Sequence, residues 1–259
     1  MVTVLSGCLA RVARVRVTLC YAAVVAAVTT VMVDMTPRLQ AAVIRHMSTN
    51  LHNLSHGRVG TLVGSAFVVD AGPLYLWLPG LICLLAAAEL VWGSRPLAIA
   101  AALGHIGASL LVAAGLTVAV AFGWMARSVA HDPDVGMSYV AMAVLGVLTG
   151  AMPTRWRAPW AVWWITVAAV VIAEDPDFTD VGHLLALVLG MVTSVRFGKP
   201  RAWTTPMVVP LAVGAAFGFL ILASDAVSMA SCAAWGALVA LVCFGFARLR
   251  PAAESELVS

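Results

Sequence analysis

Charged residues are scarce in this chain of 259 residues: only 10% are Asp, Glu, Lys or Arg, whereas 62% are hydrophobic. Soluble globular domains carry roughly 25% charged residues, so this composition excludes a soluble globular fold. Long apolar runs recur along the whole sequence, as expected for helices that cross a bilayer core ~30 Å thick. The sequence therefore predicts an all-α polytopic membrane protein.

Cysteine residues are also few, and neither they nor the histidines are spaced as in a disulfide framework or a metal site. The five cysteines comprise one in the basic N-terminal segment and four inside apolar runs: Cys8, Cys20, Cys83, Cys232 and Cys243. This arrangement resembles neither a disulfide framework nor a metal-binding spacing. The cluster His46, His52 and His56 lacks ordered acidic or thiol partners, so we expect no metal site there.

Only three ionisable residues fall inside the apolar runs, namely Glu89, His105 and His183. They are too few and too scattered to form an ion relay, which disfavours a transporter or channel. Glu89 is expected to be a buried structural acid or an interface residue rather than a proton carrier. His105 is expected to be packed or hydrogen-bonded at a depth that separates it from His183.

Eight transmembrane spans are expected, near residues 17–33, 73–92, 97–123, 137–153, 159–173, 180–195, 206–223 and 227–247. The last two divide an apolar stretch that is too long for a single crossing, with the turn at Ser224-Asp225. Residues 1–200 are interpreted as a six-span core with a long outer segment, 34–72, which is expected to form short amphipathic helices at the membrane interface. Residues 201–259 add two spans and a short cytoplasmic tail.

The basic residues set the orientation. Eleven of the 15 Lys and Arg residues lie at the two termini and in alternate loops, whereas most acidic residues lie in the other loops. By the positive-inside rule, both termini of this multi-pass cell-membrane protein are cytoplasmic. A cleaved secretory signal is the alternative at the N-terminus, but no small-residue cleavage site precedes Met35. The net charge of +3 is thus an orientation signal, and no nucleic-acid partner is expected.

Two polar residues stand near the starts of spans that run from the same side of the membrane. Ser138 follows Asp134 by ~6 Å of helical rise, and His183 follows Asp180 by ~4.5 Å. A serine and a histidine at matched depth can act as nucleophile and general base. The alternative for Ser138 is a packing residue beside a glycine, whereas an intramembrane histidine is costly and more often functional.

Four motifs together resemble the rhomboid intramembrane serine proteases. Gly136-x-Ser138 opens the fourth span, with Gly146 further on, and Gly182-His183-x-x-Ala186-x-x-x-Gly190 lies in the sixth. Glu89-x-x-x-Gly93 ends the second span, and a long outer loop that ends near Ser65-Ala66-Phe67 follows the first. The resemblance covers about residues 17–196 and is that of a divergent bacterial member.

The resemblance implies a rhomboid-like six-helix core in which Ser138 attacks a peptide carbonyl and His183 transfers the proton. Ala186 and Gly190 would let the sixth span approach the fourth closely. The implied substrate is a single-pass transmembrane protein in the lipid bilayer, and no metal or organic cofactor is required. The oligomeric state stays open.

Two departures from the family pattern leave an alternative. Tyr139 stands where proteolytic members have a glycine after the serine, and Pro73 and Trp77 stand where they carry a His-x-x-x-Asn that holds the oxyanion. Losing one such donor typically costs ~10²–10³ in rate. The alternative is therefore a weak or inactive pseudoprotease that binds transmembrane helices as a chaperone or scaffold.

Overall fold

The computed structural model describes residues 13–69, 74–223 and 226–256, and every regular element within these ranges is a helix. Five stretches are long and apolar enough to cross a membrane: Ala13–Val33, Ser94–Ala121, Thr154–Glu174, Thr205–Leu222 and Val227–Gly245. Three shorter apolar helices are Trp77–Trp92, Ser138–Ala151 and Phe178–Ser194. The chain is thus all-helical with several potential membrane spans, and eight crossings stay a prediction.

The helices follow the order of the expected spans. They are η1 (Ala13–Val15), α2 (Arg16–Val33), α3 (Pro37–Met47), α4 (Leu51–Ser55), α5 (Thr61–Gly64), η2 (Ser65–Phe67), α6 (Leu74–Trp92), α7 (Ser94–Ala121), η3 (Arg127–His131), α8 (Ser138–Ala151), α9 (Thr154–Glu174), α10 (Phe178–Ser194), α11 (Thr205–Leu222) and α12 (Ala226–Glu256). Short helices α3 to α5 confirm the helical character expected for the segment after the first span. The turn expected at Ser224-Asp225 lies outside the described residues.

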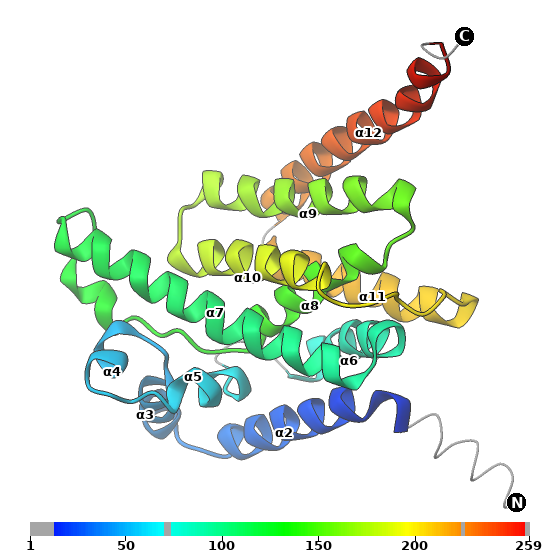
Figure 1. The fold of residues 1–259 in the computed structure, drawn as a ribbon. Coiled ribbons are helices and arrows are strands. Elements are labelled where there is room, and N and C mark those ends of the chain that lie inside the picture. Colours follow the sequence, from blue (N-terminus) through cyan, green and yellow to red (C-terminus); the bar gives the residue numbers. More distant parts are fainter. Residues whose placement is uncertain (1–12, 70–73, 224–225, 257–259) are drawn as a thin grey trace, which may run out of the picture.

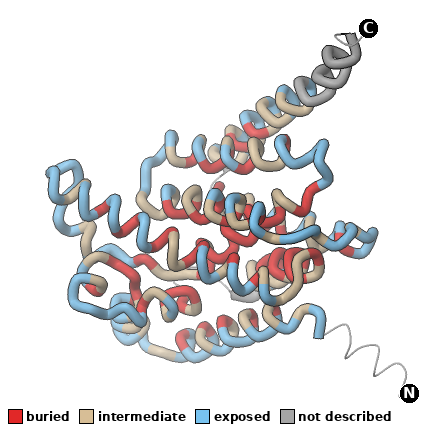
Figure 2. Tube along the Cα trace, in the orientation of Figure 1, coloured by how far each residue is buried: buried red, intermediate tan, exposed pale blue. Residues whose placement is uncertain are grey.

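Helix α8 forms the centre of the bundle. Its residues from Tyr139 to Leu148 are all buried, and they are apolar on every side of the helix. A helix that is hydrophobic all round is buried on all sides, and α6, α7 and α10 pack around this one. Figure 2 shows the buried residues gathered along these inner helices, whereas the outer faces of α2 and α12 are exposed.

Glycines bring α8 and α10 into direct backbone contact. A Cβ atom at Gly190 would overlap the carbonyl group of Ala143, and one at Gly146 would overlap that of Leu187. Ala186, one turn before Gly190, is fully buried in the same contact region. The close approach of these two helices fixes the positions of the residues at their first turns.

A polar cluster ties α2, α6 and α7 together at the end of the bundle where α2 begins. The Glu89 carboxylate on α6 accepts hydrogen bonds from the backbone N–H groups of Val17 and Thr18, at 3.0 and 2.8 Å. The hydroxyls of Thr18 and Ser94 also donate to it, each at 2.7 Å. Glu89 is fully buried, which confirms its expected structural role.

The last two helices pack on different partners. Helix α11 lies against α6, where the Phe217 side chain fills the space at Gly80 and the Leu84 backbone fills that at Gly214. Helix α12 lies along α9, with Trp163 against Gly236. Figure 1 shows α2 and α12 on opposite sides of the bundle, with the long helices between them.

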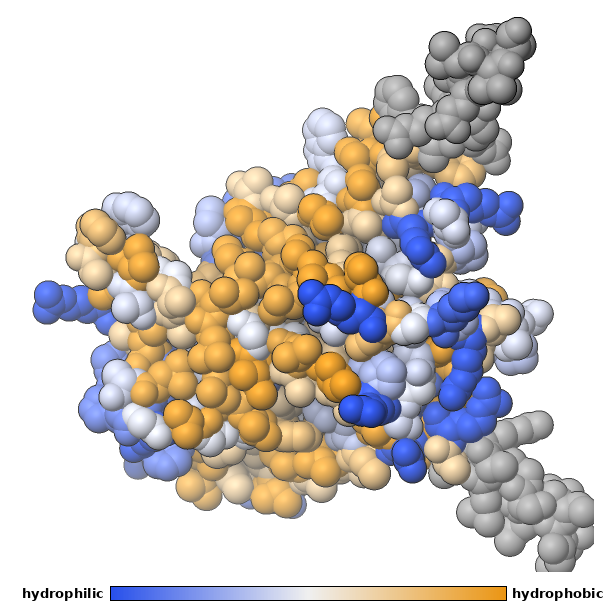
Figure 3. Space-filling model, viewed as in Figure 1, coloured by the Kyte–Doolittle hydropathy of each residue, from blue (hydrophilic) through white to orange (hydrophobic). Residues whose placement is uncertain are grey.

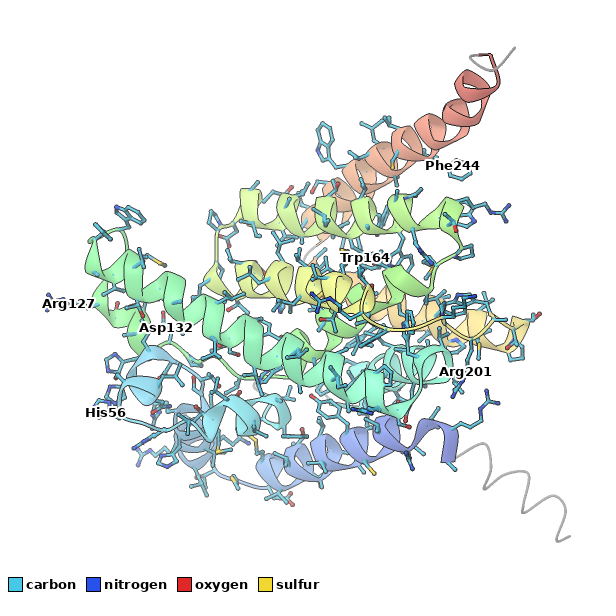
Figure 4. All side chains as sticks on the ribbon, viewed as in Figure 1. His56, Arg127, Asp132, Trp164, Arg201 and Phe244 are labelled. Atoms are coloured by element: carbon cyan, nitrogen blue, oxygen red, sulfur yellow. The ribbon has the colours of Figure 1, made fainter. Side chains whose placement is uncertain are left out.

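The surface is divided as expected for a protein in a bilayer. Figure 3 shows a broad hydrophobic area across the middle of the face, with hydrophilic side chains gathered towards its left and right ends. In Figure 4, Arg127 and Asp132 lie at the left end, Arg201 lies at the right end, and Trp164 lies between them. Which of these ends faces the cytoplasm stays a prediction.

Candidate functional site

The chain turns sharply just before α8, and this turn places Ser138 as the first residue of the helix. Gly136 has φ +126°, a conformation that residues with a side chain rarely adopt. Its N–H group donates a 2.9 Å hydrogen bond to the carbonyl oxygen of Ser65 in η2. The glycine of the Gly-x-Ser motif is therefore required by the backbone, and the turn is anchored to the segment after α2.

His183 lies in the second turn of α10 and is only 6% exposed. Its Nδ1 atom lies 3.4 Å from Oδ1 of Asp180, one turn earlier on the same helix. Neither ring nitrogen has a hydrogen-bond partner among the described residues. Buried polar atoms are normally hydrogen-bonded, so an unpaired histidine at this depth is a candidate functional group.

Ser138 and His183 line the same cavity, which has a volume of about 650 Å³. Trp77 of α6 and Phe217 of α11 also line it. Because both nitrogens of His183 are unpartnered, the serine hydroxyl does not hydrogen-bond to the histidine in this structure. Catalytic contacts are often long in resting enzymes and shorten when substrate binds, so this geometry is compatible with a Ser/His pair.

A family model described as "Rhomboid-like protein" matches residues 10–198, which include Ser138 and His183. The chain belongs to this rhomboid-like protein family. No curated protein and no solved structure matches the chain. The matched region ends before α11, and the division of this rhomboid-like protein into parts 1–200 and 201–259 stays a prediction.

Tyr139, which stands in place of the usual glycine, is accommodated by another glycine. A Cβ atom at Gly182 would overlap the phenol end of Tyr139, so the two residues are complementary. The tyrosine ring packs edge-on against the ring of His183, with centroids 5.6 Å apart. Tyr139 is 2% exposed, and its hydroxyl has no hydrogen-bond partner within the described ranges. The departure from the family pattern thus forms one wall beside the histidine.

The positions of the missing oxyanion donors are only partly described. Pro73 lies outside the described residues, whereas Trp77 lines the cavity. The N-cap of α8, Met137, makes no side-chain capping hydrogen bond. The N–H groups of a first helical turn have no partners within the helix, so those of α8 are donors beside the cavity.

His105 lies closer to the site than the sequence indicated. Its Nε2 atom is 2.9 Å from the Ser65 hydroxyl, which also accepts from Thr49 at 2.7 Å. The ring of His105 lies 6.1 Å from that of Tyr139. The hydrogen-bonded state was predicted, and His105 lies nearer the Ser94 end of α7, as the sequence indicates. The expected separation from the site is too large, because the ring of His105 reaches the ring of Tyr139.

Two carboxylates near the site were not predicted to take part in it. Asp180 contacts His183, and the spacing of three residues on one helix is the signal that indicates such a contact. Asp134 is 9% exposed, and its backbone is held by the Ser48 hydroxyl at 2.7 Å. Burial raises the pKa of the Asp134 carboxyl to about 6, and the nearby charge of Asp177 also raises it.

Proposed function

We propose that this rhomboid-like protein is an intramembrane serine endopeptidase that cleaves transmembrane proteins with Ser138 and His183. The observation that carries the proposal is the shared cavity at the start of α8 and α10, which holds a serine and a buried histidine with two unpartnered ring nitrogens. Membership of the family agrees with this assignment.

The proposed reaction needs only side chains and water. Ser138 Oγ attacks the peptide carbonyl carbon while Nε2 of His183 accepts its proton, and the C–N bond then breaks as His183 protonates the leaving amine. A water molecule next attacks the acyl-serine ester, giving its proton to His183, and Ser138 recovers that proton as the carboxylic acid leaves. Asp180 is proposed to keep the Nδ1 proton in place and to stabilise the imidazolium that forms.

The negative oxygen of the tetrahedral intermediate also needs donors. We propose the first-turn N–H groups of α8, because they lie beside Ser138 and carry the positive end of the helix dipole. With no His-x-x-x-Asn in α6, these groups supply less stabilisation than a complete set. Slow turnover is therefore expected.

A second candidate function rests on Tyr139. Its ring packs against His183 and fills the space that Gly182 leaves, which restricts the movement that a loose serine–histidine contact requires. This observation favours a pseudoprotease that binds transmembrane helices as a chaperone or scaffold. Both candidates place the protein in the cell membrane with its termini in the cytoplasm, and both have transmembrane segments as partners.

The test is cleavage of model single-pass transmembrane substrates by the purified protein in liposomes. We expect slow cleavage, and a loss of at least ~10³-fold in both Ser138→Ala and His183→Ala, because members of one catalytic unit fail together. Thr149→Ala is the matched control, since it removes a hydroxyl from the same helix outside the cavity. A folded native protein that binds helices but is never labelled at Ser138 by a serine-reactive phosphonate contradicts the protease and supports the scaffold.

A further inference from the structure

Helix α11 lies outside the matched family region and forms one wall of the Ser138/His183 cavity. Val213, Ala216, Phe217, Leu220 and Ile221 of α11 line this cavity. The helix is therefore part of the boundary of the candidate site. A transmembrane segment that reaches Ser138 along this wall passes on one side of α11 or the other.

The side of α11 that faces α6 is closed at two levels. A Cβ atom at Gly80 would overlap the Phe217 side chain, and one at Gly214 would lie 2.6 Å from the Cα atom of Leu84. Contacts this short bring the two helices together around Gly80 and Leu84, and a substrate helix cannot pass at these levels without separating α11 from α6. Elsewhere Trp77 and Pro79 of α6 line the cavity together with α11.

The side of α11 that faces α9 is hollow. A groove of about 520 Å³ runs between these helices, and we call it the α9–α11 groove; its lining residues are Trp160, Trp163, Trp164, Ala215, Ala216, Phe219 and Leu220. None of the described side chains of α12 lines the groove, although α12 packs on α9 at Trp163. The lining is wholly apolar side chains apart from the indole N–H groups, which suits the hydrocarbon depth of a bilayer.

The groove and the cavity share part of their lining. Ala216 and Leu220 belong to both, and both residues are exposed, with Leu220 at 54%. The groove is thus continuous with the site across one face of α11. At this crossing, alanines at positions 215 and 216 present little bulk, and small residues let another helix approach closely.

We propose that a single transmembrane helix docks in the α9–α11 groove and reaches Ser138 across Ala216 and Leu220. This inference deepens the proposed function and depends on it for the fate of the docked helix, but docking itself does not require catalysis. The two residues that the groove shares with the cavity both come from α11, so this added helix would influence which transmembrane segments reach the site.

The first test is site-specific photocrosslinking in the full-length Ser138→Ala protein, reconstituted in liposomes with a model single-pass transmembrane substrate. The probe p-benzoylphenylalanine replaces Ala216 or, as a control, Ala212. Ala212 is exposed on the same helix and lines neither the groove nor the cavity. We expect an adduct with the substrate helix from position 216 and only background from position 212.

The second test fills the groove. Ala215→Phe places a ring beside Trp163 and Phe219 without changing a residue of the cavity, whereas Ala212→Phe adds the same ring outside the groove. Overfilling a packing site should lower cleavage of the transmembrane substrate about tenfold in Ala215→Phe only. Labelling of Ser138 by a small phosphonate should be equal in both variants, because that reagent does not need the groove.

The outcomes separate this inference from the protease assignment. Adducts at position 216 without any phosphonate labelling support docking and reject catalysis. Normal labelling and cleavage with equal adducts at 212 and 216, or with no loss in Ala215→Phe, reject the groove and leave the protease. Adducts from position 216 that contain only lipid, or only a second copy of this chain, also overturn the proposal.

Discussion

Two polar clusters lie within the helical bundle, and they are built in opposite ways. The Glu89 cluster joins three helices, and its carboxylate accepts four hydrogen bonds from Val17, Thr18 and Ser94. The second cluster, Ser138, Asp180 and His183, which we call the His183 cluster, lies where α8 and α10 begin. Neither nitrogen of its histidine has a hydrogen-bond partner in the described part of the chain, although Asp180 lies 3.4 Å from Nδ1. One cluster is complete without any other molecule, whereas the other has unused hydrogen-bonding capacity beside a cavity.

The difference separates a structural polar group from a functional one. A buried polar group costs free energy unless it is hydrogen-bonded, and the Glu89 cluster meets this condition and stabilises the packing of α2 on α6. The His183 cluster does not meet it, and the cost is tolerated beside the shared cavity. Stability should therefore depend on Glu89 and activity on His183.

The largest effect should come from removing the complete cluster. We expect Glu89→Ala to lower the free energy of unfolding by about 4 kcal/mol, because two backbone N–H groups each lose an acceptor at a cost of about 1–3 kcal/mol. Denaturation in detergent by SDS titration measures this change. Asp175→Ala, at an exposed acid, is the control and should change stability by less than about 0.5 kcal/mol.

The free energy of unfolding of a His183 variant tests whether the two clusters differ in their contribution to stability. His183→Phe keeps a ring and removes two unpartnered nitrogens, so its unfolding free energy should stay within about 1 kcal/mol of the native value. Cleavage should nevertheless be lost. If His183→Phe unfolds as easily as Glu89→Ala, the two clusters do not differ in the way proposed.

The next effect concerns Asp134 and pH. Its pKa rises from 3.8 to about 6 because burial disfavours the charged form. A raised pKa in the folded state means that the stabilisation is present below pH 3.8 and is lost as the pH rises through 6, by about 3 kcal/mol. Asp134→Asn removes the ionising group, so it should be more stable than the native protein at pH 7 and no more stable near pH 4.

Thermal unfolding at pH 4, 5, 6 and 7 tests this prediction. Asp132→Asn is the control, since Asp132 is exposed in the same connection. Its difference from the native protein should not change over this range. An Asp134→Asn variant that is destabilised at pH 7 would falsify the proposal that the buried, charged carboxylate of Asp134 destabilises the protein at this pH.

Composition and hydropathy predicted the helical architecture well, because each expected span is a continuous apolar run and such runs form helices. The short helices after α2 and the structural role of Glu89 were also predicted. Composition and hydropathy did not predict the contacts between helices. That Gly182 receives the phenol of Tyr139, or that α11 closes against α6 and leaves a hollow against α9, depends on how separate helices rotate and pack.

Contacts between helices at the candidate site were likewise not predictable from the sequence. Depth along the spans pairs Ser138 with His183, and both line one cavity. Depth does not show that the ring of His105 lies 6.1 Å from that of Tyr139, because this distance depends on how α7 and α8 pack and not on the bounds of the span. The contact of Asp180 with His183 has a signal in the sequence, since a spacing of three residues places the two on one helical face.

The smallest predicted effect tests that contact. Asp180→Asn removes the negative charge 3.4 Å from Nδ1 of His183 while keeping the size of the side chain. We expect kcat for a transmembrane substrate to fall about tenfold with KM unchanged, because an orienting carboxylate acts on the imidazolium that forms in the reaction. The fall is smaller than for a buried aspartate because Asp180 is 21% exposed and water replaces part of its effect.

Asp177→Asn is the matched control, because Asp177 precedes the same helix, is exposed and makes no side-chain capping hydrogen bond. A purely structural role for Asp180 would lower the unfolding temperature or raise KM, whereas a positioning role lowers kcat and the rate of phosphonate labelling by the same factor. Asp180→Glu should recover part of that rate, since it restores the charge at a changed distance. Equal rates in the Asp180→Asn and native proteins would show that Asp180 does not orient His183. Neither ring nitrogen would then have a protein partner during the reaction, and the contrast with the fully hydrogen-bonded Glu89 carboxylate would hold for both nitrogens.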